Sequence, residues 1–196
     1  MSKRSSTQEF FEKTMLLAAP LLFGFSTFFW SNGEYDTRGA SLLIIALMCW
    51  IPAFQSLFSL VKPFAPNYAQ WGWLVALYGC ISGVCFAFLG YFATALAVPH
   101  DTYVKALEQY PISSGVLLFW AGPLFPLSLL VLSGVLYRVN AAPGWICLVL
   151  AVGAILFPIS RIQRVEWVAH ISDLLILIAL GYFAVIKPAA HQKPMY

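Results

Sequence analysis

Charged residues are scarce in this chain. Lys and Arg number 11 and Asp and Glu number 8 among 196 residues, so that 10% of the chain is charged and 61% is apolar. Soluble domains are about a quarter charged, so this composition excludes a large soluble domain and most large enzyme folds. The net charge of +3 is spread along the chain. Because no run of Lys or Arg would follow a phosphate backbone, we expect no nucleic-acid partner.

Clustered metal ligands are also missing. The four cysteines, Cys49, Cys80, Cys85 and Cys147, stand apart within apolar stretches and show no CxxC spacing. Structural zinc sites and disulfide frameworks have recognisable cysteine spacings. We therefore interpret these cysteines as small buried hydrophobic residues. The sequence predicts no metal site, and it identifies no cofactor.

Long apolar stretches, by contrast, make up almost the whole chain. Crossing the hydrocarbon core of a bilayer takes about 20 helical residues, and backbone polar groups in lipid must bond within their own segment. Each stretch should therefore be a spanning helix, with the lipid bilayer as its surroundings. The sequence predicts an all-α, single-domain transmembrane bundle of six helices, at about residues 14–30, 40–61, 71–98, 112–137, 143–159 and 167–186.

The basic residues predict the orientation of this bundle. Basic residues are enriched on the cytoplasmic side of membrane proteins. A cytoplasmic N-terminus would put seven of them inside, namely Lys3, Arg4, Lys13, Lys62, Arg138, Lys187 and Lys193, and four outside, namely Arg38, Lys105, Arg161 and Arg164. We therefore expect both termini in the cytoplasm.

The third apolar stretch carries a row of small residues on one helical face. Its members are Gly72, Ala76, Gly79, Gly83, Ala87 and Gly90, followed by Thr94. Small residues four positions apart let two helix backbones approach closely in lipid. This stripe predicts that the third helix is the central post of the bundle. The same stripe would also suit a homodimer or a contact with another membrane subunit.

Polar residues gather at the start of the sixth stretch and in the loop before it. Glu166, His170 and Asp173 follow i, i+4, i+7 spacing and so share one helical face, with Asp173 about two turns inside. A carboxylate within the membrane is costly and is usually paired, protonated or turned towards water. His170 is within reach of a hydrogen bond to Asp173. Arg161 and Arg164 lie just outside, where they can bind a carboxylate or phosphate group or neutralise nearby acids.

Two kinds of function fit these five residues. They can form an outward-facing pocket that binds a small ligand, an ion or a proton. Alternatively, they form a salt-bridge network that holds the last helix to the outer loops, because structural networks also contain such charges. The protein would then be a structural or accessory subunit of a larger membrane complex. A membrane-embedded enzyme is a third possibility, but no second acid–base cluster on another helix supports it, and no catalytic residue is predicted.

The last third of the chain resembles small uncharacterised bacterial multi-pass proteins. The resemblance lies in Arg138, the short turn at Pro143 and the following Trp145, which introduce an Ala-, Gly- and Leu-rich stretch that ends near Ile162. It implies a bacterial inner (plasma) membrane protein of six or seven helices. It carries over no activity, cofactor or site residue.

Overall fold

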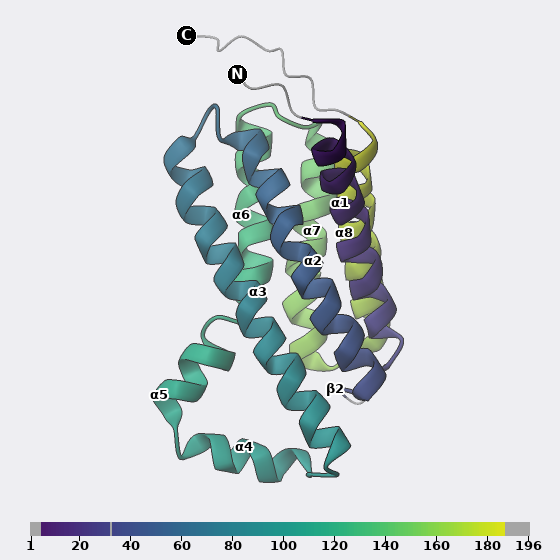
Figure 1. Cartoon of the computed structure of the whole chain (residues 1–196), viewed down its shortest axis with the longest axis vertical. Helices are drawn as coiled ribbons and strands as arrows, with labels where there is room; N and C mark the ends of the chain where they lie inside the picture. The colour runs from purple at the N-terminus through teal and green to yellow at the C-terminus, as the bar shows by residue number, and fades with distance from the viewer. Residues whose placement is uncertain (1–4, 32, 187–196) are drawn as a thin grey trace.

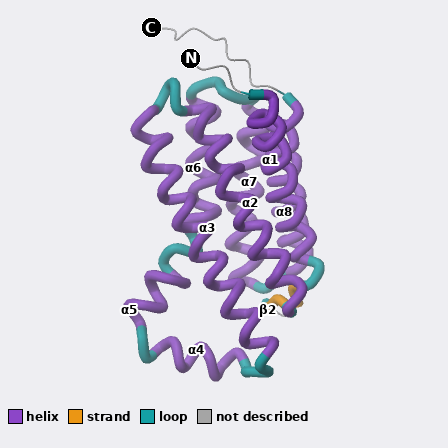
Figure 2. Tube along the Cα trace, in the orientation of Figure 1, coloured by secondary structure: helices purple, strands orange, loops and turns teal. Residues whose placement is uncertain are grey.

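The computed structural model describes residues 5–31 and 33–186. Figure 1 shows long helices that run up and down side by side. In chain order the elements are α1 (Ser6–Thr27), β1 (Trp30–Ser31), β2 (Glu34–Tyr35), α2 (Thr37–Val61), α3 (Pro66–Ala95), α4 (His100–Glu108), α5 (Pro111–Ser114), the π-helical turn η1 (Gly115–Phe119), α6 (Leu124–Arg138), α7 (Gly144–Gln163) and α8 (Glu166–Val185). The predicted all-α class is confirmed, and the two short strands form only a hairpin between α1 and α2, as Figure 2 shows.

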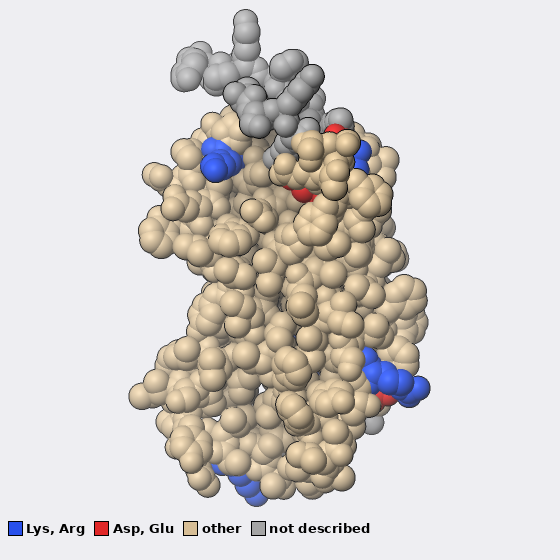
Figure 3. Space-filling view, in the orientation of Figure 1, with Lys and Arg blue, Asp and Glu red and all other residues tan. Residues whose placement is uncertain are grey.

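Four of these helices, α2, α3, α7 and α8, are long and apolar enough to cross a membrane. The α5–η1 segment and α6 together pass the same test, so the described residues hold up to five such spans. In Figure 3 the charged side chains of the visible face lie towards its two ends, and the surface between them is uncharged. Both observations indicate a membrane-embedded protein.

The ends of the helices follow from local chemistry. Asp36 precedes α2 and accepts a hydrogen bond from the backbone N–H of Gly39 at 2.7 Å, which satisfies one of the free donors of the first turn. Pro66 begins α3, where a missing N–H has no cost. Arg164 ends α7 in the left-handed conformation with a φ of 56°.

The interior of the bundle is occupied by α2. Within the 18-residue stretch of α2 that could cross the hydrocarbon core, 50% is buried inside the protein. The corresponding stretch of α3 is 28% buried. Trp50, Phe54 and Leu57 of α2 are fully buried, and α2 contacts α1, α3 and α6. The expectation that the third helix is central was wrong. Small residues show which face of a helix approaches a neighbour closely, but they do not show how many neighbours surround it.

The small-residue stripe of α3 packs within the chain along most of its length. A Cβ on Gly79 would lie 2.6 Å from the backbone nitrogen of Phe125 in α6, so only glycine permits this approach. Added Cβ atoms on Gly72 and Gly83 would lie 2.7 Å and 2.9 Å from Phe58 and Leu47 of α2. Ala76 and Ala87 are buried as well. Gly90, the last glycine of the stripe, has no such neighbour.

The fourth apolar stretch is broken rather than continuous. The axes of the α5–η1 segment and α6 differ by 43° across the break before Leu124. Pro123 lies in this break and cannot donate an intrahelical hydrogen bond. Tyr78 and Ser82 of α3 donate hydrogen bonds to the carbonyl groups of Val116 and Leu118. These bonds satisfy carbonyl groups of the irregular segment that are not paired as in a regular helix.

One helix was not predicted. Residues 100–108, which precede the fourth stretch, form α4, and Figure 1 shows it lying across the end of the bundle. It is short and polar on one face, so it lacks the length and apolar composition that mark a membrane-spanning helix in a sequence.

The start of α1 and the end of α8 lie at the same end of the bundle in Figure 1. The ends of α2 and α6, with Lys62 and Arg138, lie there too, opposite the hairpin. Four residues used to predict the orientation, Lys3, Arg4, Lys187 and Lys193, lie outside the described residues.

Candidate functional site

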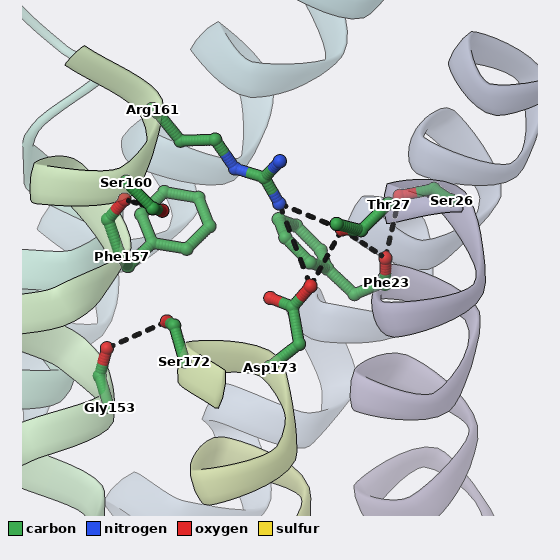
Figure 4. Close-up of polar contacts among 9 residues, drawn as sticks. All are labelled: Phe23, Ser26, Thr27, Gly153, Phe157, Ser160, Arg161, Ser172 and Asp173. Carbon is green, nitrogen blue, oxygen red and sulfur yellow. Dashed lines mark hydrogen bonds and ion pairs between the residues drawn. The ribbon is translucent and has the colours of Figure 1, made fainter. Parts of the chain in front are cut away.

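Three side chains from three helices meet in the interior of the bundle, as Figure 4 shows. Arg161 lies in the last turn of α7, Asp173 in α8 and Thr27 at the end of α1. Nη2 of Arg161 donates a hydrogen bond to Oγ1 of Thr27 at 2.9 Å and lies 3.6 Å from Oδ2 of Asp173. The Thr27 hydroxyl donates to the same carboxylate oxygen at 2.6 Å. We call these three residues the Arg161 cluster.

Close packing of α7 and α8 brings Arg161 and Asp173 together. A Cβ on Gly153 of α7 would lie 2.8 Å from the Ile176 side chain of α8, so glycine is needed at this crossing. Ser172 donates a hydrogen bond to the Gly153 carbonyl oxygen at 2.9 Å. The chain then turns directly from α7 into α8, which places the arginine and the aspartate on facing sides of a helical hairpin.

Aromatic rings surround the Arg161 guanidinium. Its central carbon lies 4.5 Å from the ring centre of Trp30, 5.4 Å from that of Phe157 and 5.6 Å from that of Tyr35. Cation–π attraction contributes about 0.5–2 kcal/mol, most where water is excluded. Because Trp30 and Tyr35 are paired in the β1–β2 hairpin, the hairpin holds both rings beside the guanidinium.

The Arg161 cluster is shielded from solvent. The side chain of Asp173 is 5% exposed and that of Arg161 is 17% exposed. Nη1 of Arg161 and Oδ1 of Asp173 are buried without a hydrogen-bond partner in the described part of the chain. Leaving a buried polar group unpaired costs about 1–3 kcal/mol. The cluster therefore contains one donor group and one acceptor atom whose hydrogen bonds the described residues do not satisfy.

A cavity of about 280 Å³ lies beside Arg161, and we call it the Arg161 cavity. Its volume is close to the lower limit of the range of about 300–1,000 Å³ found for small-molecule pockets. Five helices, the hairpin and the broken segment before α6 form its mainly apolar wall. Its aromatic lining includes Phe23, Trp30, Tyr35, Phe125 and Phe157, and its polar lining includes Ser82 and Arg161.

A second cavity, of about 300 Å³, adjoins the first. Gly33, Tyr35 and Phe86 line both cavities, so the tip of the hairpin and α3 separate them. The remaining wall of the second cavity comes from the hairpin, the end of α3 and the segment that leads into α4. Tyr103 of α4 completes it.

Tyr35 lies between these cavities and remains protonated at neutral pH. Burial raises the pKa of its phenol. The charge of Arg161 opposes this rise, whereas the charge of Asp173 adds to it. The phenol can therefore donate a hydrogen bond.

The structure brings together two of the five residues predicted for the polar pocket, Arg161 and Asp173. His170 lies half-buried, and the centre of its ring is 4.6 Å from that of Phe28. The hydrogen bond considered between His170 and Asp173 is not formed among the described residues, because Oδ2 of Asp173 faces Thr27 and Arg161.

The other two predicted residues lie at the surface. Glu166 is in the first turn of α8 and is exposed. Arg164 is exposed too, and its side chain lies against the hairpin, since a Cβ on Gly33 would be 2.5 Å from its Cδ. Gly33 also has a φ of +85°, which favours glycine. Asp36, which precedes α2 near the hairpin, pairs with Arg38 at 3.0 Å and not with Arg161 or Arg164.

Sequence reasoning missed Thr27, Trp30 and Tyr35. Thr27 was included in an apolar stretch, and its partner Asp173 lies 146 positions away. The available signal was a hydroxyl pair, Ser26 and Thr27, near the end of a spanning helix. In the described residues, no group of three or more His, Cys, Asp or Glu side chains could hold a metal ion. Comparison with protein-family models, curated proteins and solved structures found no match.

Proposed function

We propose that this chain is a membrane protein that binds a small ligand in the Arg161 cavity. The observation that carries this proposal is the position of Arg161, which lines the cavity and has a buried Nη1 without a partner among the described residues. Buried polar groups are normally hydrogen-bonded. A purely structural ion pair would need no adjoining cavity. The mainly apolar lining favours an organic ligand over a bare ion or a proton.

The alternative is an accessory subunit that docks on a larger membrane complex, or on a second copy, through the small-residue stripe of α3. It has less support, because Gly72, Gly79 and Gly83 already meet α2 and α6 of their own chain. A membrane-embedded enzyme is the third hypothesis. It has the least support, because among the described residues the cavity has no acid–base group other than the Arg161 cluster and Tyr35.

We also propose six spans in a bacterial inner membrane, with both termini in the cytoplasm. The spans are α1, α2, α3, the bent α5–η1 and α6 unit, α7 and α8. Charges in its first turns, including Glu9, Glu12 and Lys13, make α1 the least apolar of them. Lys62 and Arg138 would then lie inside, and Arg38 and Arg161 towards the outside, as the positive-inside rule prefers.

Thiol labelling in intact cells tests this orientation. In a cysteine-free background, Asn67→Cys lies at the start of α3, and Gln163→Cys lies at the opposite end of the bundle. Both positions are exposed. A membrane-impermeant reagent should label Gln163→Cys in intact cells and Asn67→Cys only after lysis. The reverse pattern would show the opposite orientation.

A cavity-filling variant tests ligand binding. Leu43 of α2 lines the Arg161 cavity, whereas Ile45 on the same helix is 49% exposed and does not. The full chain and the variants Leu43→Trp and Ile45→Trp would be purified gently from their native membrane, and bound molecules would be identified by mass spectrometry. We expect a stoichiometric small molecule in the wild type and Ile45→Trp that Leu43→Trp lacks. A stoichiometric protein partner without such a molecule would favour the accessory subunit instead.

A further inference from the structure

The positive charge of the Arg161 guanidinium is paired with Asp173, but the hydrogen-bond donors on its Nη1 have no partner among the described residues. Its Nη2 is occupied by Thr27 and Asp173, while Nη1 is buried beside the cavity without a described partner. Figure 4 shows Nη1 pointing away from Asp173. Each terminal guanidinium nitrogen carries two N–H groups. Nη1 is closed off in this conformation, so a ligand oxygen would meet it once a lining side chain moves aside, and it would then satisfy a donor that the described residues leave unpaired.

The charge of Asp173 determines whether a charged or a neutral ligand oxygen can bind at Nη1 of Arg161. Asp173 already lies 3.6 Å from the guanidinium and is 5% exposed, so the two charges are paired in a region of low dielectric. A carboxylate or phosphate ligand would bring a second negative charge close to Asp173 and would repel it. A neutral carbonyl oxygen accepts a hydrogen bond from Nη1 without this repulsion.

The lining of the cavity suits a flat ring. Phe23 and Phe125 are parallel to within 4°, with ring centres 5.7 Å apart, and Phe157 lies within 5.6 Å of both. Trp30 and Tyr35 complete the aromatic lining near the guanidinium. Aromatic groups prefer stacked or edge-to-face contacts with other rings. A planar conjugated head group would make such contacts where an alkyl chain would not.

The cavity opens on the side of the bundle. Phe86 of α3 and Phe119 of η1 both line it, yet they are 47% and 50% exposed. Its mouth therefore lies between α3 and the broken segment that precedes α6. In a membrane-spanning bundle this face meets lipid, so a ligand would enter from the bilayer and would itself be lipophilic.

We propose that the Arg161 cavity binds a membrane-soluble quinone-type molecule, with a carbonyl oxygen at Nη1 of Arg161, the ring among the aromatic side chains and any tail directed through the mouth between Phe86 and Phe119. This inference rests on the proposed function, which requires only that the cavity binds a small ligand.

Titration of the full chain in lipid nanodiscs with decylubiquinone tests this inference. Binding would be followed by tryptophan quenching, to which Trp30 should contribute, and by calorimetry. Decanoate is the matched probe, since it has a similar chain but an acidic head group. We expect saturable binding of the quinone and at least tenfold weaker binding of decanoate. Arg164→Gln, outside the cavity lining, should bind the quinone like the wild type.

Two variants keep the test independent of folding defects. The double variant Arg161→Gln/Asp173→Asn removes both charges together and should lose at least tenfold in quinone affinity while retaining a cooperative unfolding transition. Leu43→Trp keeps the cluster but fills the cavity and should lose binding as well. Equal quinone affinity in the wild type and these variants would overturn the inference.

The remaining outcomes separate this inference from the proposed function. Binding of decanoate without the quinone would overturn the ligand class and leave the function standing. If neither probe binds, but a small molecule co-purifies with the wild type and Ile45→Trp and not with Leu43→Trp, the ligand class is again wrong and the proposed function stands. If neither probe binds and no small molecule co-purifies, both proposals fail.

Discussion

The Thr27 hydroxyl donates a hydrogen bond to the Asp173 carboxylate at 2.6 Å and joins the end of the first helix to the last one. The same hydroxyl oxygen accepts from Nη2 of Arg161. Thr27 thus links an arginine and an aspartate that lie 3.6 Å apart.

Replacing Thr27 tests this link. Thr27→Val keeps the shape of the side chain but removes its donor and acceptor, and it should lower stability by about 1 kcal/mol, a typical value for polar contacts between membrane helices. Thr27→Ser keeps the hydroxyl and should behave like the wild type. Thermal unfolding in detergent measures both. Equal melting temperatures for Thr27→Val and Thr27→Ser would show that the bond contributes nothing.

The Arg161–Asp173 pair should show strong coupling. Either Arg161→Gln or Asp173→Asn leaves a buried charge without its partner and should cost about 3–5 kcal/mol. The double variant removes both charges and should cost clearly less than the sum of the single variants. A double-mutant cycle of unfolding free energies in detergent gives the coupling. Additive single effects would contradict a direct pair.

Two glycines of α3 provide a matched pair for helix packing. Gly79→Ala places a Cβ 2.6 Å from the backbone of Phe125, and backbone cannot move aside as a side chain can. We expect a loss of at least about 1–3 kcal/mol, as for overpacked cores. Gly90→Ala meets nothing within 4 Å and should be neutral or slightly stabilising because alanine favours helix. Similar melting temperatures for the two variants would contradict the close approach of α3 and α6.

Asp36 should make stability depend on acid pH. Burial opposes its ionised form, but hydrogen bonds from Gly39 and Arg38 outweigh this effect and lower the pKa of the carboxyl. Stability from this group is therefore present above its unfolded pKa and is lost as pH falls through the lower folded pKa, that is, below about pH 4. Asp36→Asn keeps a capping oxygen but should lose less stability over that range.

Melting temperatures between pH 3 and pH 7 compare the wild type with Asp36→Asn. If Asp36→Asn shows the full acid loss of the wild type, other groups are responsible.

Hydropathy predicted the long helices because membrane length and apolar composition are local properties. It placed α2 and α7 within a few residues of their ends. It did not find α4, which is too short and polar, or the break before Leu124, because a proline within an apolar stretch hardly changes its hydropathy. The centrality of α2 was hidden because burial against protein and exposure to lipid require the same apolar residues.

The candidate site was predictable only in part. Arg161 was visible as a charge just outside a predicted span, and Asp173 as a charge within it. Their actual neighbours, Thr27 and the aromatic pair Trp30 and Tyr35, come from the other end of the sequence. Spacing along one helix suggested His170 as the partner of Asp173, because i, i+3 neighbours share a face. Instead, α1 and α7 approach α8 and supply Thr27 and Arg161 as the partners of Asp173.

The short turn between α7 and α8 has a consequence for synthesis in the cell. Arg161 and Asp173 are twelve positions apart in sequence, so they reach the translocon within moments of each other. If the two helices partition into lipid as one hairpin, each charge is accompanied by its counter-charge, and the cost of burying either alone is avoided. Thr27, made long before, would receive its partners only when this hairpin arrives. Closure of the bundle would then be the last step of its biogenesis.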